Sequence, residues 1–285
     1  NLLVNIPLAR SFGQFIHPSL PTWFECKRRW GQTSSIGANT VILRILFNID
    51  LILLGVLASP EVAGNYAAAA KIIFFLVIAV EVLWAALLPR LSRLAKISPA
   101  GFRSAFNLYF GSVTAMLMPI AIGGWIVGAD LINLLYRGKF TESGPIFKIL
   151  AISYTMLALA TFLGNSLLAQ DRQKMYLLPL IASSSIAFFA IRFLVPEHGG
   201  LGASWGIIIS HGLLLVILTF INFRNFNRLV VETLISLAPG LFVMVFILNL
   251  VSNWHVILQI AAGGASYTIL ALYPLLRLRR LSSLT

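Results

Sequence analysis

The chain of 285 residues is 59% hydrophobic and only 11% charged. A soluble domain carries about a quarter charged residues and less than half apolar residues, and a globule of this size has too little interior to bury so many apolar side chains. This composition excludes a soluble enzyme, a disordered segment and a disulfide-rich secreted scaffold. The net charge of +12 would indicate nucleic acid in a soluble protein, but membrane proteins concentrate Lys and Arg in cytoplasmic loops. We therefore expect the lipid bilayer as a partner, and no nucleic acid.

Eight apolar stretches are long enough to cross a bilayer as helices, which requires about 20 residues each. They are residues 37–58, 66–88, 108–129, 145–168, 176–195, 203–222, 231–251 and 256–276. Backbone polar groups in hydrocarbon must be satisfied within their own segment, and the two-residue alternation of a β-barrel is absent. The predicted fold is all-α: a polytopic membrane protein with about eight transmembrane helices.

Basic residues are concentrated in every second predicted loop. Fourteen Lys and Arg fall in five segments that would share one side of the membrane: 27–29, 89–107, 169–175, 223–230 and 277–280. Of the loops on the other side, only 130–144 carries any, Arg137 and Lys139. Positively charged loops face the cytoplasm, so the N-terminal segment and the C-terminus are predicted to be cytoplasmic.

Charged side chains inside spans are costly and are usually paired or functional. From the helical rise, Asp50 lies roughly 12 Å and Arg44 roughly 21 Å below the outer end of the first span, with Lys71 roughly 8 Å and Glu81 roughly 22 Å deep in the second. Arg44 therefore matches Glu81 in depth, and Lys71 comes within reach of Asp50. Asn48 shares the helix face of Arg44, four residues on.

These groups support two interpretations. In one, two salt bridges join the first two spans. In the other, the groups line a hydrated cavity, where Arg44, Asn48 and Lys71 would bind an anionic cargo and Asp50 and Glu81 would bind the coupling ion. His211, about 12 Å deep in the sixth span, is either a structural hydrogen-bonding residue or a proton relay.

Enzyme motifs are missing from the sequence. There is no metal-ligand spacing of Cys and His, no HExxH, no P-loop and no GxSxG. We expect no enzyme activity, no catalytic residue, no metal and no cofactor.

Several segments resemble the bacterial O-antigen and polysaccharide flippases, within the MATE-like exporter superfamily. The likeness covers about residues 30–280 and rests on the order and spacing of seven short segments along the chain. The segments are 48–55 (NIDLILLG), 62–72 (VAGNYAAAAKI), 88–93 (LPRLSR), 135–140 (LYRGKF), 146–150 (IFKIL), 163–170 (LGNSLLAQ) and 199–203 (GGLGA).

The resemblance implies a 14-helix transporter with two six-helix lobes and two final helices, of which this chain is the C-terminal portion. Residues 1–36 would be the end of a truncated helix and a cytoplasmic loop, 37–222 the second lobe, and 223–285 the final helices with a basic cytoplasmic tail. The missing N-terminal lobe would be a partner. The family implies a multi-pass protein of the bacterial cytoplasmic (inner) membrane.

The function implied is export of an anionic undecaprenyl-pyrophosphate-linked oligosaccharide for cell-surface polysaccharide or O-antigen synthesis, by alternating access coupled to an ion gradient. A drug/cation antiporter of the same superfamily is the main alternative, against which the buried bases Arg44 and Lys71 count. A membrane-embedded glycan polymerase or transferase is disfavoured by the short outer loops. A non-transporting structural membrane protein remains a fourth interpretation.

Overall fold

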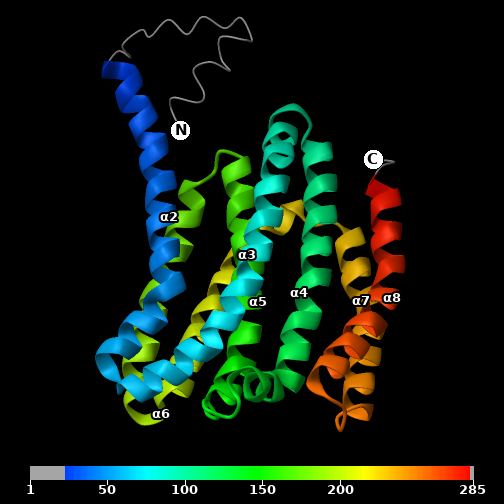
Figure 1. Ribbon diagram of the computed structural model, residues 1–285. Helices are drawn as coiled ribbons and strands as arrows, with labels where there is room; N and C mark the ends of the chain where they lie inside the picture. Colours follow the sequence, from blue (N-terminus) through cyan, green and yellow to red (C-terminus); the bar gives the residue numbers. More distant parts are fainter. Residues whose placement is uncertain (1–22, 283–285) are drawn as a thin grey trace, which may run out of the picture. The chain divides into compact units, whose positions relative to one another are not determined.

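The structure is a computed structural model that describes residues 23–282, and the regular elements in that range are all helical. In chain order they are α2 (Trp23–Leu57), α3 (Pro60–Ile97), α4 (Pro99–Tyr136), α5 (Ser143–Ala169), α6 (Lys174–Asn222), the short 3-10 helix η1 (Phe223–Asn225), α7 (Arg228–Leu250) and α8 (Val256–Ser282). Within residues 38–285, Figure 1 shows a bundle of long helices that run back and forth along a common direction. The predicted all-α, polytopic fold is confirmed.

Each predicted span lies in one of these helices. Six helices in the described part of the chain are long and apolar enough to cross a membrane, and α6 is one of them although it contains two predicted spans. The apolar part of α8, Val256–Leu272, is shorter than the others.

The helix α6 is a hairpin with two antiparallel arms. Its backbone leaves helical geometry at Gly199, where φ is 53° and ψ is −130°. Ser183 of the first arm and Ser210 of the second are joined by hydroxyl and carbonyl hydrogen bonds of 2.8–2.9 Å. The predicted spans 176–195 and 203–222 are therefore separate passes that a sharp reversal connects.

Several helices continue beyond the apolar stretch that predicted them. The helix α2 begins at Trp23, so the predicted segment 1–36, the end of a helix and a cytoplasmic loop, is helical from there on, whereas residues 1–22 lie outside the described part. The helix α3 runs on to Ile97 through the basic segment after Pro89, and Ser98 then caps α4 by accepting a 3.0 Å hydrogen bond from Gly101 N. Hydropathy detects only the membrane-embedded part of a helix, which explains these differences.

The helix α5 forms the centre of the bundle. Most of its residues are buried, and it packs against α3, α4 and α6. The helices α7 and α8 pack against each other and against α4, around a small core of their own that includes Leu237, Met244 and Tyr267. The chain divides into two compact units, 1–37 and 38–285, and every site described below lies in the second. The division into 37–222 and 223–285 stays a prediction.

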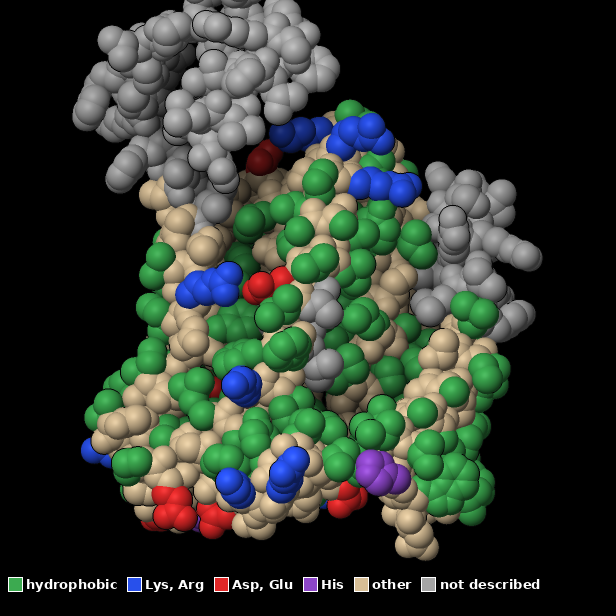
Figure 2. All heavy atoms as spheres, viewed as in Figure 1, with side chains coloured by type: hydrophobic (Ala, Val, Ile, Leu, Met, Phe, Trp, Pro, Cys, Tyr) green, Lys and Arg blue, Asp and Glu red, His purple; other side chains and the backbone are tan. Residues whose placement is uncertain are grey.

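The two ends of the larger unit differ in charge. The α3–α4 junction, the α5–α6 loop and η1 lie together at one end of the bundle, and the α2–α3 turn, the α4–α5 loop and the α7–α8 turn lie at the other (Figure 1). On the face in Figure 2, hydrophobic side chains cover most of the surface between these ends, and few charged side chains lie among them. This arrangement groups three of the predicted basic segments, 89–107, 169–175 and 223–230, at one end, while their cytoplasmic location stays a prediction.

Candidate functional site

Asp50 lies at a buried polar centre where α2, α3 and α5 meet. Its side chain is fully buried. Tyr66 Oη donates to Asp50 Oδ2 at 2.5 Å, Tyr154 Oη donates to the same oxygen at 3.3 Å, and Leu51 N donates to Oδ1 at 2.8 Å. A carboxyl removed from water needs such donors, because an unpaired polar group there is costly.

The expected contact between Lys71 and Asp50 does not form. Lys71 is exposed and forms no ion pair with any residue in the described range. Depth fixes only the height of a residue along a helix. Lys71 is five residues from the buried Tyr66, which at 100° per residue places the two on different faces of α3. Tyr66, and not Lys71, therefore turns toward Asp50.

His211 is held in the interior between α6 and α5. It is fully buried, and its Nδ1 lies 2.8 Å from Ser153 Oγ and 3.1 Å from the Ser153 carbonyl oxygen. Its ring packs edge-on against Tyr154, with 5.5 Å between ring centres. These contacts fit a structural hydrogen-bonding residue, but the buried His211 Nε2 has no partner among the described residues, so the choice between a structural residue and a proton relay stays open. His211 and Asp50 both contact Tyr154, so the two candidate ion-coupling residues belong to one polar cluster.

Arg44 and Glu81 form the ion pair that their depths predict. Arg44 Nη1 lies 3.9 Å from Glu81 Oε1, and the side chains remain 67% and 50% exposed. Asn48, also exposed, does not contact the guanidinium but donates to the Arg44 carbonyl oxygen at 2.8 Å. We name the exposed polar groups Arg44, Asn48 and Glu81 the polar face of α2 and α3.

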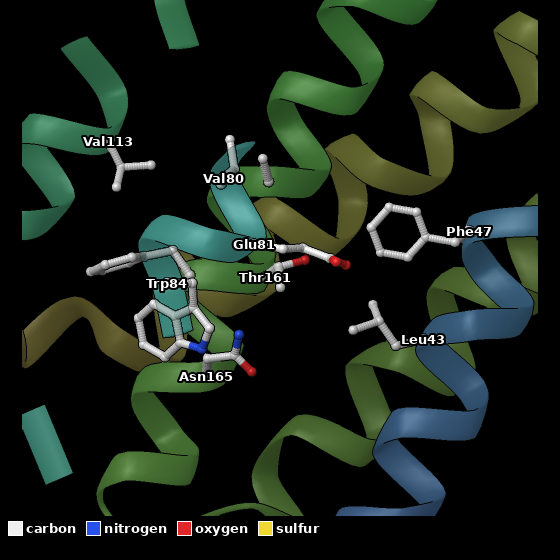
Figure 3. A pocket seen from close by; sticks show the side chains of 10 residues that line it. Leu43, Phe47, Val80, Glu81, Trp84, Val113, Thr161 and Asn165 are labelled. Carbon is white, nitrogen blue, oxygen red and sulfur yellow. The ribbon is translucent and has the colours of Figure 1, made fainter. Parts of the chain in front are cut away.

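A cavity of about 230 Å³ opens beside Glu81, between α2, α3, α4 and α5. Figure 3 shows the Glu81 side chain extending from α3 toward Phe47 and Leu43 of α2, beside Thr161 of α5. The other walls are apolar apart from the Asn165 amide; they include Val80, Trp84, Val113, Ala158 and Phe162. At about 30 Å³ per water, this space holds several waters but no oligosaccharide.

Several residues of the site were not singled out from the sequence. Tyr66 and Tyr154 bind Asp50, and Thr161 and Asn165 line the cavity. The sequence could have indicated Tyr66, because it follows Asp50 by sixteen residues, across the short α2–α3 turn, and so comes close to it in depth. Nothing in the local sequence marks Tyr154, because most residues of its helix are buried and no single face stands out.

The fold and the polar groups within it describe an all-helical, multi-pass membrane protein with charged side chains between its helices. Residues 28–145 match a family model described as "Polysaccharide biosynthesis protein". A search of the curated proteins found no match. The matched region includes Arg44, Asn48, Asp50, Lys71 and Glu81, so the likeness to a protein of polysaccharide biosynthesis covers the polar face and the buried carboxyl but not His211.

Proposed function

We propose that this protein exports a lipid-linked, anionic oligosaccharide across the bacterial cytoplasmic membrane by flipping it between leaflets. The observation that carries the proposal is the Arg44–Glu81 pair, exposed at the middle of two adjoining helices within the region similar to polysaccharide biosynthesis proteins. A glycan and its pyrophosphate cannot cross hydrocarbon unaided, and a hydrated path with cationic groups lowers that barrier.

The exposure of the polar face supports a hydrated path. An Arg side chain facing acyl chains at mid-depth costs about 2.5–3.5 kcal/mol by insertion measurements, and other charged side chains inside a span are also costly. Yet Arg44 and Glu81 keep half or more of their side-chain surface exposed, and Asn48 lies beside them. We therefore place this face against water and a second lobe, and assign contact with the pyrophosphate to Arg44.

The loose geometry of the pair favours a substrate role over a purely structural one. A charge-assisted bond in a tight pair is about 2.7–2.9 Å long, whereas Arg44 and Glu81 are 3.9 Å apart. The guanidinium thus retains free donors for an anion. The cavity is smaller than a sugar chain, so the glycan would travel along the polar face, and the cavity would hold water beside Glu81.

A cation antiporter is the second candidate, and Asp50 is the observation that favours it. Asp50 is buried, bound by tyrosine hydroxyls, and has no Lys or Arg within ion-pair distance among the described residues. A carboxyl in such a place binds a proton or a cation without displacing a fixed partner. In the flippase, the same group would couple export to an ion gradient, with His211 stabilising the neighbouring Tyr154.

The test uses cells that carry the gene in its natural form. Deletion is expected to leave lipid-linked oligosaccharide on the inner leaflet and to leave drug sensitivity unchanged. Arg44→Ala is expected to lower export by roughly 10- to 100-fold, the range for losing one hydrogen bond to a charged group. Glu81→Ala is expected to impair export as well. The matched control is Arg192→Ala, which removes an exposed cation of α6 outside the polar face. Export is expected to be unchanged in this variant.

Two results would contradict the proposal. Raised drug sensitivity with normal glycan export in the deletion strain would favour the antiporter. Full export in the Arg44→Ala/Glu81→Ala double variant would show that the pair only holds α2 to α3. Membrane abundance of every variant is measured in parallel, so that loss of protein is not read as loss of transport.

A further inference from the structure

Two adjoining hollows lie at the basic end of the bundle, away from the polar face. One, of about 410 Å³, is lined by Arg172, Arg224, Phe220 and Phe223. The other, of about 250 Å³, is lined by Arg103, Arg172 and Arg224. Both share Arg172 and Arg224, so three arginines from α4, the α5–α6 loop and η1 border one continuous region.

In the described part of the chain, these three arginines have no carboxylate partner. All three side chains are exposed, and none is within ion-pair distance of a carboxylate in the described part of the chain. Arg172 Nη2 donates to the Met175 sulfur at 3.0 Å. At the same end, by contrast, Arg228 Nε lies 2.9 Å from Glu232 Oε1. The arginines of the hollows therefore retain guanidinium donors for an external anion.

Buried amides hold the backbone that carries Arg224. Asn107 Nδ2 donates to the Asn225 carbonyl oxygen at 2.8 Å, and Asn107 Oδ1 accepts from Asn227 N at 3.1 Å. Asn222, fully buried, accepts from Ser166 Oγ at 2.9 Å and from Asn225 Nδ2 at 3.2 Å. The turn between α6 and α7 is thus fixed on both sides, which reduces the entropy lost when a ligand binds there.

The position of Arg172 is also set by the backbone. Arg172 N donates to the Leu167 carbonyl oxygen at 2.8 Å, across Asp171, whose φ is 58°. This turn closes the C-terminal end of α5. It directs the chain so that Arg172 borders both hollows.

Exposed aromatic rings lie next to these guanidinium groups. Phe220 is 75% and Phe223 70% exposed, and both line the larger hollow with Arg172 and Arg224. The end of a transmembrane bundle lies where headgroups meet acyl chains. Guanidinium groups that bind phosphate, beside rings that contact hydrocarbon, match a ligand with an anionic head and an apolar tail.

We propose that this region, formed by Arg103, Arg172 and Arg224 with Phe220 and Phe223, binds the phosphate headgroup of an anionic phospholipid. The guanidinium groups donate paired hydrogen bonds to phosphate oxygens, and the rings pack against the first part of an acyl chain. The site is independent of the exported cargo, because it lies at the end of the bundle and not on the polar face.

The test is native mass spectrometry of the purified protein, titrated with phosphatidylglycerol, phosphatidylcholine or inorganic phosphate. The pocket variant carries Arg103→Gln, Arg172→Gln and Arg224→Gln. Its matched control carries Arg90→Gln, Arg93→Gln and Lys96→Gln, which removes the same charge at the same end but outside the hollows. Each cation near a membrane surface contributes about fivefold to binding an anionic lipid, so the pocket variant should lose about 100-fold in affinity for phosphatidylglycerol.

Tight phosphatidylglycerol binding that the pocket variant loses and the control keeps would support the proposal. Equal losses in both variants would overturn it, because the lipid would then respond only to overall charge. Equal binding of phosphatidylcholine, or binding of inorganic phosphate as tightly as the lipid, would also overturn it. Arg224→Gln alone, with an expected fivefold loss, provides the same comparison should the triple variant not fold.

Discussion

Removing the hydroxyl of Tyr66 tests how the interior of the bundle stabilises Asp50. Tyr66 Oη lies 2.5 Å from Asp50 Oδ2, and Tyr154 Oη lies 3.3 Å from the same oxygen. Interhelical hydrogen bonds in membrane bundles contribute about 0.6 kcal/mol on average and about 1.7 kcal/mol at most. A short bond to a buried carboxyl belongs near the upper value. We therefore expect Tyr66→Phe to lower the free energy of unfolding by about 1.5 kcal/mol and Tyr154→Phe by about 0.5 kcal/mol.

The assay is equilibrium unfolding in mixed micelles with a rising fraction of denaturing detergent. Combining Tyr66→Phe with Asp50→Asn gives a double-mutant cycle, in which the coupling free energy should be about 1 kcal/mol because the two groups are in direct contact. Additivity within about 0.5 kcal/mol would refute the reasoning, since it would mean that the short bond contributes nothing specific. A larger loss from Tyr154→Phe than from Tyr66→Phe would refute the ranking by distance.

Two glycine substitutions test the packing of the passes. Gly199→Ala should destabilise the protein by about 1–3 kcal/mol, because φ of 53° with ψ of −130° is accessible to glycine alone. Gly264→Ala, with open space around its Cβ, is the control. Equal melting temperatures for the two variants would contradict the view that Gly199 is required by its backbone conformation. Gly164→Ala should cost about 1–3 kcal/mol because the new methyl group would overlap the ring of Tyr176. Gly55→Ala, with nothing near its Cβ, should leave thermal unfolding unchanged, and a comparable loss there would show that helix-wide effects dominate.

The membrane-spanning segments could be predicted from the sequence because lipid imposes a one-dimensional rule. A stretch of apolar residues must span as a helix, and the alternation of basic loops predicts the direction of each pass. The hairpin of α6 was correctly divided into two spans, since Pro196 and the pair of glycines that follows Glu197 and His198 interrupt the apolar run.

Contacts across the bundle were harder to predict because they depend on rotation about each helix axis. Depth alone found the Arg44–Glu81 pair, whose side chains are long and exposed. Depth alone failed for Asp50, where a lysine at a suitable height points away and a tyrosine on another face binds instead. Nothing in the sequence predicts that Arg103, Arg172 and Arg224 lie together. Each of them is more than fifty residues from the next along the chain.

The reversal at Gly199 leaves no slack between the arms of α6. The two arms are also joined by hydrogen bonds between Ser183 and Ser210, so a sliding movement of one arm alone would break these bonds. We therefore expect the two passes of α6 to move together in any conformational change of the bundle.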